Sequence, residues 1–117
     1  MTTTDLLDAE CIADLRDVLD AEKLNALVSR FIRETDTSLE NLNENTCSGS
    51  EIAEVLHKIA GSAAALGADR FRSALVTTET AFREGKLKDA RLHLDGLSAI
   101  WRETRVLLAD LATLEQG

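Results

Sequence analysis

Residues 87–115 carry one long helical repeat, and the whole chain contains no proline that could interrupt such a helix. Apolar and small side chains recur there at alternating spacings of three and four residues. This alternation is typical of a helix that packs along its length in a bundle. The positions are Leu87, Ala90, Leu94, Leu97, Trp101, Thr104, Leu108 and Leu111. The pattern therefore favours a fold built from long helices packed side by side.

The composition supports the same fold class. Leucine and alanine supply most of the apolar content, aromatic residues make up 3% of the chain, and tyrosine is absent. Leucine and alanine favour helices, whereas strands are enriched in aromatic and β-branched residues. The 117 residues, 44% of them hydrophobic, are enough for one domain with its own core. Because the chain shows no linker, low-complexity run or internal repeat, we expect residues 1–117 to form a single domain.

The remaining helices are predicted from apolar periodicity and from their end signals. Ser48 followed by Glu51 is typical of a capping box. Gly67 and Gly85 are placed to end helices, and Asp69 to cap the next one. The predicted helices span residues 8–19, 21–45, 48–66, 69–84 and 87–115, with a turn at 46–49. Short connections make neighbouring helices antiparallel, so we expect an all-α, up-down four-helix bundle with an additional short N-terminal helix closing one end.

Each predicted helix carries one apolar face, and these faces define the expected core. In chain order, the positions before the last helix are Ile12, Leu15 and Leu19; Leu24, Val28, Phe31, Thr35, Leu39 and Leu42; Ile52, Leu56, Ile59, Ala63 and Leu66; and Phe71, Leu75, Thr78 and Phe82.

Charge and hydropathy exclude several classes of protein. The net charge of −8 argues against binding to nucleic acid, which depends on neutralising phosphates with Lys and Arg. No apolar run approaches the roughly 20 residues of a membrane span, and the first residues lack the pattern of a signal peptide. Cys11 and Cys47 stand alone without metal-ligand spacing. We therefore expect a cytoplasmic monomer with reduced thiols, no resident metal and no contact with membranes.

One histidine stands out from this helical background. His57 precedes Gly61 by one helical turn, so the two lie on the same face. A glycine inside a helix costs about 1 kcal/mol of helix stability relative to alanine. Its presence here is explained if Gly61 gives a partner access to the imidazole. Close helix packing at Gly61 beside an ordinary surface histidine remains the alternative. A helical wheel places His57 about 140° from the core stripe. The small residues Ala53, Ala60 and Ala64 are predicted on the same flank, where they would form a shallow patch around an exposed nucleophile.

The stretch from Leu56 to Ala68, which reads H-K-I-A-G-S-A-A-A-L-G-A after the leucine, resembles the signature of histidine phosphotransfer (HPt) domains. That signature is roughly H-x-L-K-G-S followed by a short run to L-G-A. The similarity extends to Phe31, to the Leu-Gly-Ala turn and to the segment ending at Gly85, and so covers most of the chain. It implies a four-helix bundle that relays a phosphoryl group between aspartates of receiver domains, or takes one from a kinase.

Carried over by position, the resemblance makes His57 the phosphoacceptor and Gly61 the access notch. Ser62 matches the serine that follows this glycine, although its hydroxyl could equally bond back to its own helix. The implied partners are a response-regulator receiver domain, a hybrid histidine kinase, or both. The resemblance implies a phosphotransfer intermediate rather than an enzyme. No cofactor is expected in this chain, because the aspartate cluster and Mg²⁺ should come from the receiver domain.

Two further positions bear on this interpretation. The family usually has lysine three residues after the histidine, where this chain has Ala60. On the helical wheel, residue 60 lies about 60° to one side of His57 and Lys58 about 100° to the opposite side. The long side chain of Lys58 could still reach a phosphoryl oxygen. Glu79 is predicted on the flank of its helix, where it could accept a hydrogen bond from His57 Nδ1 and leave Nε2 free. A solvated glutamate is the alternative.

Other functions compete with phosphotransfer. Glu54 and His57 have the i, i+3 spacing of di-iron bundles, but the second such pair is missing and both side chains are predicted to project outward. His93 is predicted to pack at the edge of the core. A helical adaptor that binds a receiver domain or kinase without phosphoryl chemistry remains open because Ala60 replaces the lysine. The dimerisation module of a sensor kinase is a further alternative, which the Gly-Ser after His57 fits less well.

Overall fold

The computed structural model describes residues 9–44 and 48–116, of which most lie in helices. In chain order these are α2 (Ala9–Val18), α3 (Ala21–Glu44), α4 (Gly49–Ala65), α5 (Asp69–Arg83) and α6 (Leu87–Gln116). The described part of the chain contains no strand, so the expected all-α class is confirmed. The predicted first-helix start at residue 8, the second-helix end at residue 45 and the turn residues 46 and 47 lie outside the described residues.

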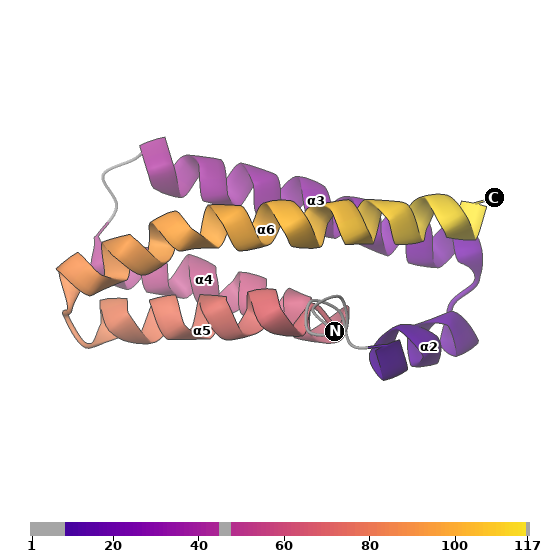
Figure 1. Cartoon of the computed structure of the whole chain (residues 1–117), viewed down its shortest axis with the longest axis horizontal. Helices are drawn as coiled ribbons and strands as arrows, with labels where there is room; N and C mark the ends of the chain where they lie inside the picture. Colours follow the sequence, from indigo (N-terminus) through magenta and orange to yellow (C-terminus); the bar gives the residue numbers. More distant parts are fainter. Residues whose placement is uncertain (1–8, 45–47, 117) are drawn as a thin grey trace.

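The four longer helices lie lengthwise beside one another (Figure 1). Helix α4 packs against α5, α5 against α6, and α6 against α3, whereas α3 and α4 contact each other only sparsely. The short α2 lies at the end of the molecule where α3 begins. There the Cys11 thiol is 3.6 Å from the main-chain oxygen of Ala65, near the end of α4. The sparse α3–α4 contact leaves one side of α4 less covered than the side facing α5.

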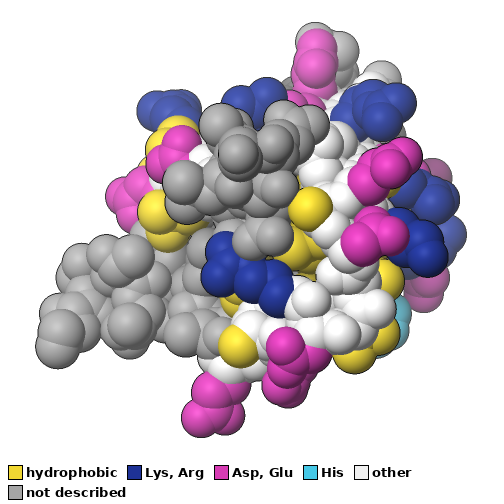
Figure 2. Space-filling model, turned by 90° about the vertical axis from the view of Figure 1, so that its right-hand side faces the viewer, with side chains coloured by type: hydrophobic (Ala, Val, Ile, Leu, Met, Phe, Trp, Pro, Cys, Tyr) yellow, Lys and Arg dark blue, Asp and Glu magenta, His cyan; other side chains and the backbone are white. Residues whose placement is uncertain are grey.

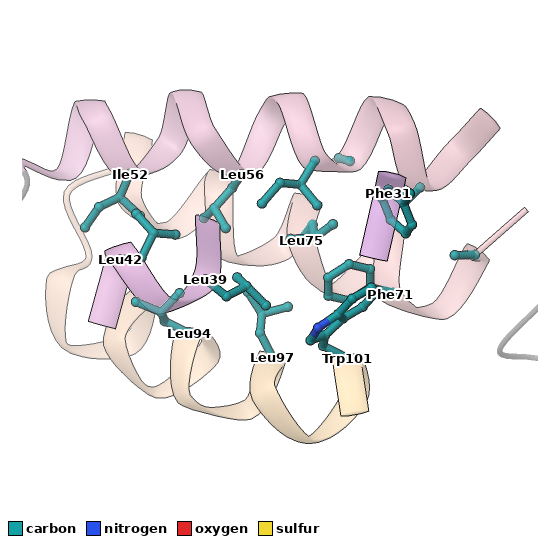
Figure 3. Close-up of a cluster of buried hydrophobic side chains, with 14 of the residues drawn as sticks. Phe31, Leu39, Leu42, Ile52, Leu56, Phe71, Leu75, Leu94, Leu97 and Trp101 are labelled. Carbon is teal, nitrogen blue, oxygen red and sulfur yellow. The ribbon is translucent and has the colours of Figure 1, made fainter. Parts of the chain in front are cut away.

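The core lies between these helices and is built from the predicted apolar faces (Figure 3). Every predicted core position of α3, α4 and α5 is buried, and Ile12 of α2 is buried as well. The Trp101 ring is packed between two other rings. It lies edge-on to Phe31, with 5.5 Å between the ring centroids, and tilted against Phe71, with 4.9 Å between the ring centroids. Its indole N–H donates a 2.7 Å hydrogen bond to Asp36. The polar end of the largest core side chain is therefore satisfied.

Two predictions for α6 are wrong. Leu87 is 56% exposed because it is the first residue of the helix, at the end of the molecule. His93 is exposed rather than packed at the core edge. The prediction rested on apolar residues that follow His93 at seven-residue intervals, of which Ile100 and Leu107 are half-buried. A seven-residue spacing drifts around a straight α-helix by about 20° per repeat, so this series of residues has left the core at His93. The side chain of Leu111, another predicted core position, is outside the described set.

The start of α4 confirms the predicted capping box. The Ser48 hydroxyl accepts from the Glu51 backbone N–H at 3.2 Å, and the Glu51 carboxylate accepts from the Ser48 backbone N–H at 3.2 Å. These bonds lower the pKa of Glu51. The larger cause is the hydrogen bond from the Ser48 backbone, and the smaller is the one that involves the Ser48 side chain. Gly67 and Gly85, with φ of 73° and 75°, end α4 and α5 in the left-handed conformation that glycine adopts readily.

The predicted cap by Asp69 is wrong. Residue Ala68 occupies the N-cap position of α5 and makes no side-chain cap bond. The turn at Gly67 leads directly into the helix, and the Asp69 N–H donates to the Gly67 carbonyl at 2.9 Å. Asp69 is thus already the first residue of α5, where its negative charge still favours the helix N-terminus.

Replacing Ser48 with alanine should lower the free energy of unfolding by about 1 kcal/mol, because the substitution removes the N-cap acceptor. The hydrogen bond to the Glu51 carboxylate makes part of this stability depend on pH. Because its folded-state pKa is lowered, its contribution is present at neutral pH and is lost as the pH falls through that pKa. Urea unfolding followed by circular dichroism measures the loss. Ser50→Ala, an exposed serine in the same first turn, is the matched control and should change stability far less. Equal losses in both variants would contradict the capping assignment.

On the end of the molecule seen in Figure 2, acidic and basic side chains are interspersed rather than gathered by sign. In the part of the chain that the structure describes, no helix combines the length and apolarity that crossing a bilayer requires.

Candidate functional site

His57 lies in the middle of α4 with 71% of its side chain exposed. Gly61, one turn later, is also exposed, and a Cβ atom built on it would meet no other group within 4 Å. The alternative in which Gly61 permits close helix packing is therefore wrong. Ala64, a further turn along, is exposed as well. The imidazole thus stands beside an open, low surface that runs toward the end of α4.

Two members of the predicted patch lie elsewhere. Ala53 and Ala60 are 0% and 7% exposed, and both belong to the buried core. The helical wheel predicts them on the flank of His57. Helix α5, however, packs so closely along α4 that it buries residues of α4 beyond the apolar stripe. The exposed small patch beside His57 is therefore limited to Gly61 and Ala64.

Glu79 of α5 approaches His57 from the neighbouring helix. Its Oε2 lies 3.3 Å from Nδ1 of the imidazole, and its side chain is only 12% exposed. The predicted position on the flank of α5, rather than fully in solvent, is confirmed. The turn at Gly67 brings the two residues together, because it folds α5 back along α4. The opposite ring nitrogen, Nε2, is the one that this contact leaves unengaged.

Two charged residues complete the group, and sequence reasoning missed the role of one of them. Arg83 Nε donates a 2.9 Å hydrogen bond to the same Oε2 of Glu79, and Arg83 Nη2 lies 3.6 Å from Oε1 of Glu54 on α4. The bond to Glu79 is the main cause that raises the pKa of Arg83, so its charge is retained. The i, i+4 spacing of Glu79 and Arg83 was the available sequence signal. We call His57, Glu79, Arg83 and Glu54 the His57 cluster.

Lys58 and Ser62 face the other side of α4. Both line an open groove of about 910 Å³ between α3 and α4, whose α3 wall includes Arg30, Phe31 and Glu34. This groove exists because α3 and α4 contact each other so little. The Ser62 hydroxyl makes no bond to its own helix among the interactions of the described residues, unlike the hydroxyls of Thr78 and Thr104. Lys58 and His57 therefore occupy different flanks of α4.

The surface position of the His57 cluster bears on the metal alternative. Glu54 and His57 are 66% and 71% exposed, whereas the carboxylates of di-iron bundles project into the core. Among the side chains that the structure describes, no group of three or more His, Cys, Asp or Glu residues is arranged to hold a metal ion. The geometry on this flank is that of an exposed imidazole whose Nδ1 lies 3.3 Å from the Glu79 carboxylate.

Comparison with protein families gives one match. The family model described as the Hpt domain matches residues 26–117, which is more than half of the chain and includes α4, α5 and α6. A comparison with curated proteins found no significant match, and neither did one with solved structures.

Proposed function

The chain belongs to the Hpt domain family, and on this basis we propose that it relays a phosphoryl group through His57. The family consists of phosphotransfer carriers that interact with receiver domains and kinases in phosphorelays. One observation carries the assignment to this residue: an imidazole that is 71% exposed stands next to the open space at Gly61, with a carboxylate at its Nδ1. The open space matters because a protein donor must bring its phosphoryl group within bonding distance of the ring.

The proposed reaction uses Nε2 as the nucleophile. Its lone pair attacks the phosphorus of an aspartyl phosphate on a receiver domain, the N–P bond forms, and the P–O bond to the aspartate breaks, so the carboxylate leaves. The ring keeps its proton on Nδ1 and gains positive charge as the bond forms. Glu79 Oε2, 3.3 Å away, accepts the hydrogen bond from Nδ1–H and stabilises this charge. Transfer in the other direction reverses each step.

The surroundings of His57 are assigned to partner binding. Gly61 and Ala64 form the low surface over which a receiver domain approaches, and Ser62 and Lys58 contact it from the groove side. The acidic cluster and Mg²⁺ that phosphoryl transfer requires belong to the receiver domain in this proposal. The scaffold is proposed to be an antiparallel up-down four-helix bundle within a single domain, residues 1–117, acting as a cytoplasmic monomer.

A panel of receiver domains tests this function. Each receiver is phosphorylated with ³²P-labelled acetyl phosphate, freed of the donor, and mixed with the full chain in the presence of Mg²⁺. We expect at least one receiver to transfer label to the chain within minutes, giving a phosphoryl group that is labile in acid and stable in base. Stable binding of a receiver without any transfer would instead support the adaptor function, which Ala60 in place of the family lysine favours.

Replacing Lys58 with alanine should change the transfer rate less than tenfold. Lys58 lines the α3–α4 groove rather than the flank that holds Glu79, so its charge reaches the phosphoryl group only from a distance. Exposed ion pairs contribute about 0.2–1 kcal/mol, which corresponds to a rate factor of roughly five at most. Transfer kinetics from a phosphorylated receiver measure the effect, with Lys88→Ala on α6 as the matched control. Complete loss of transfer in Lys58→Ala would show that this lysine has taken over the role of the family lysine.

A further inference from the structure

Arg83 shares its acceptor with the imidazole. The Oε2 atom of Glu79 lies 2.9 Å from Arg83 Nε and 3.3 Å from His57 Nδ1, so both nitrogens share one acceptor oxygen. Glu79 is 12% exposed, whereas Arg83 is 44% exposed. A glutamate side chain has several accessible rotamers, and a second donor on the same oxygen restricts them. Arg83 therefore limits where the Glu79 carboxylate can be when the ring is not bonded to it.

The same guanidinium reaches across to the histidine's own helix. Arg83 Nη2 lies 3.6 Å from Oε1 of Glu54, which precedes His57 by three residues on α4. Arg83 thus lies between a carboxylate on α5 and a carboxylate on α4, both on the flank of His57. The planar guanidinium suits this bridging role, because its donors point in fixed, different directions.

We propose that Arg83 is a positioning residue for phosphotransfer: it holds the Glu79 carboxylate against Nδ1 and so keeps His57 in the tautomer whose Nε2 is free. Arg83 acts through Glu79 and does not itself contact the phosphoryl group. This inference rests on the proposed function, but its first consequence concerns the resting imidazole and can be measured without any transfer.

The first test is the tautomer of His57 in the unphosphorylated protein. Two-dimensional ¹H–¹⁵N NMR of the ring nitrogens, recorded where the ring is neutral, distinguishes Nδ1–H from Nε2–H. We expect the Nδ1–H form to predominate in the parent chain and to lose its predominance in both Arg83→Gln and Glu79→Gln. Lys86→Gln is the matched control: it removes one positive charge three residues away and breaks an ion pair with Glu84 at 3.3 Å. The control should leave the ring signals unchanged, and an unchanged tautomer in Arg83→Gln would overturn the proposal.

The second test separates positioning from a general charge effect. Arg83→Gln should slow transfer from a phosphorylated receiver by roughly threefold to tenfold. In the Glu79→Gln background, adding Arg83→Gln should cause little further loss, because the carboxylate through which Arg83 acts is already absent. Equal fold-losses in both backgrounds would refute an action through Glu79.

The two tests also distinguish this inference from the proposed function. If no variant and no parent chain accepts phosphoryl groups while the tautomer still changes in Arg83→Gln, the phosphotransfer assignment fails and the structural role of Arg83 stands. If the parent chain transfers normally and the tautomer is insensitive to Arg83, only the inference about Arg83 fails.

Discussion

Replacing His57 with glutamine is expected to abolish phosphoryl labelling of the chain. Glutamine keeps a planar polar group of similar length but has no nucleophilic ring nitrogen, so no N–P bond can form. Because the side chain is 71% exposed and His57 does not belong to the buried core cluster, the helices should form as before. Circular dichroism should therefore remain unchanged while label from a phosphorylated receiver is lost completely.

The second histidine supplies the control for this experiment. His93 is also exposed, but it lies on α6 outside the His57 cluster. His93→Gln should accept label at the parental rate and to the parental extent. Labelling that persists in His57→Gln, or that disappears in His93→Gln, would show that the phosphoacceptor has been assigned to the wrong residue.

Replacing Gly61 with leucine is expected to block transfer while stabilising the fold. Leucine is a better helix former than glycine by nearly 1 kcal/mol, and the space around the Cβ of residue 61 is open, with nothing from the rest of the molecule within 4 Å. Side chains on a helix lean toward its N-terminus and cover the preceding turn. A leucine at 61 would thus extend toward His57 and fill the space a donor must enter. We expect a loss in transfer rate of more than tenfold.

A matched glycine tests whether the effect is local. Gly96 lies inside α6, is exposed, and likewise has nothing within 4 Å of a built Cβ. Gly96→Leu should raise the free energy of unfolding by a similar amount and leave transfer unchanged. Thermal unfolding and transfer kinetics on both variants give the comparison. Normal transfer in Gly61→Leu would mean that the open space beside His57 has no role in donor access.

Much of the fold is predictable because its signals are local. The apolar faces of α3, α4 and α5, the capping box at Ser48 and the turns at Gly67 and Gly85 each depend on residues within a few turns of one another. The failures have a different cause. Ala53 and Ala60 are buried because α5 covers more of α4 than the apolar stripe predicts, and periodicity within one helix carries no information about how closely its neighbour approaches.

The same limit applies to the candidate site. His57 and Gly61 share one helix face, so their juxtaposition followed from spacing, and Glu79 was placed near them by the tight turn between α4 and α5. The link from Arg83 to Glu54 crosses two helices and depends on their register, which the sequence does not specify. The α3–α4 groove that Lys58 lines likewise depends on the sparse contact between these two helices, which the sequence does not specify. The residues proposed to carry the chemistry thus follow from the sequence pattern, whereas the contacts of Arg83 and the place of Lys58 in the groove required the structure.

The most direct test of phosphotransfer through His57 is the position of phosphorus in the phosphorylated chain. The protein is labelled with ¹⁵N at histidine, phosphorylated by a receiver domain, and studied by ³¹P and ¹H–¹⁵N NMR. We expect a single phosphoryl group on Nε2 of His57, with the proton retained on Nδ1 beside Glu79 and the signals of His93 unchanged. Phosphorus on Nδ1 of His57, on His93 or on a side chain that is not histidine would contradict this assignment.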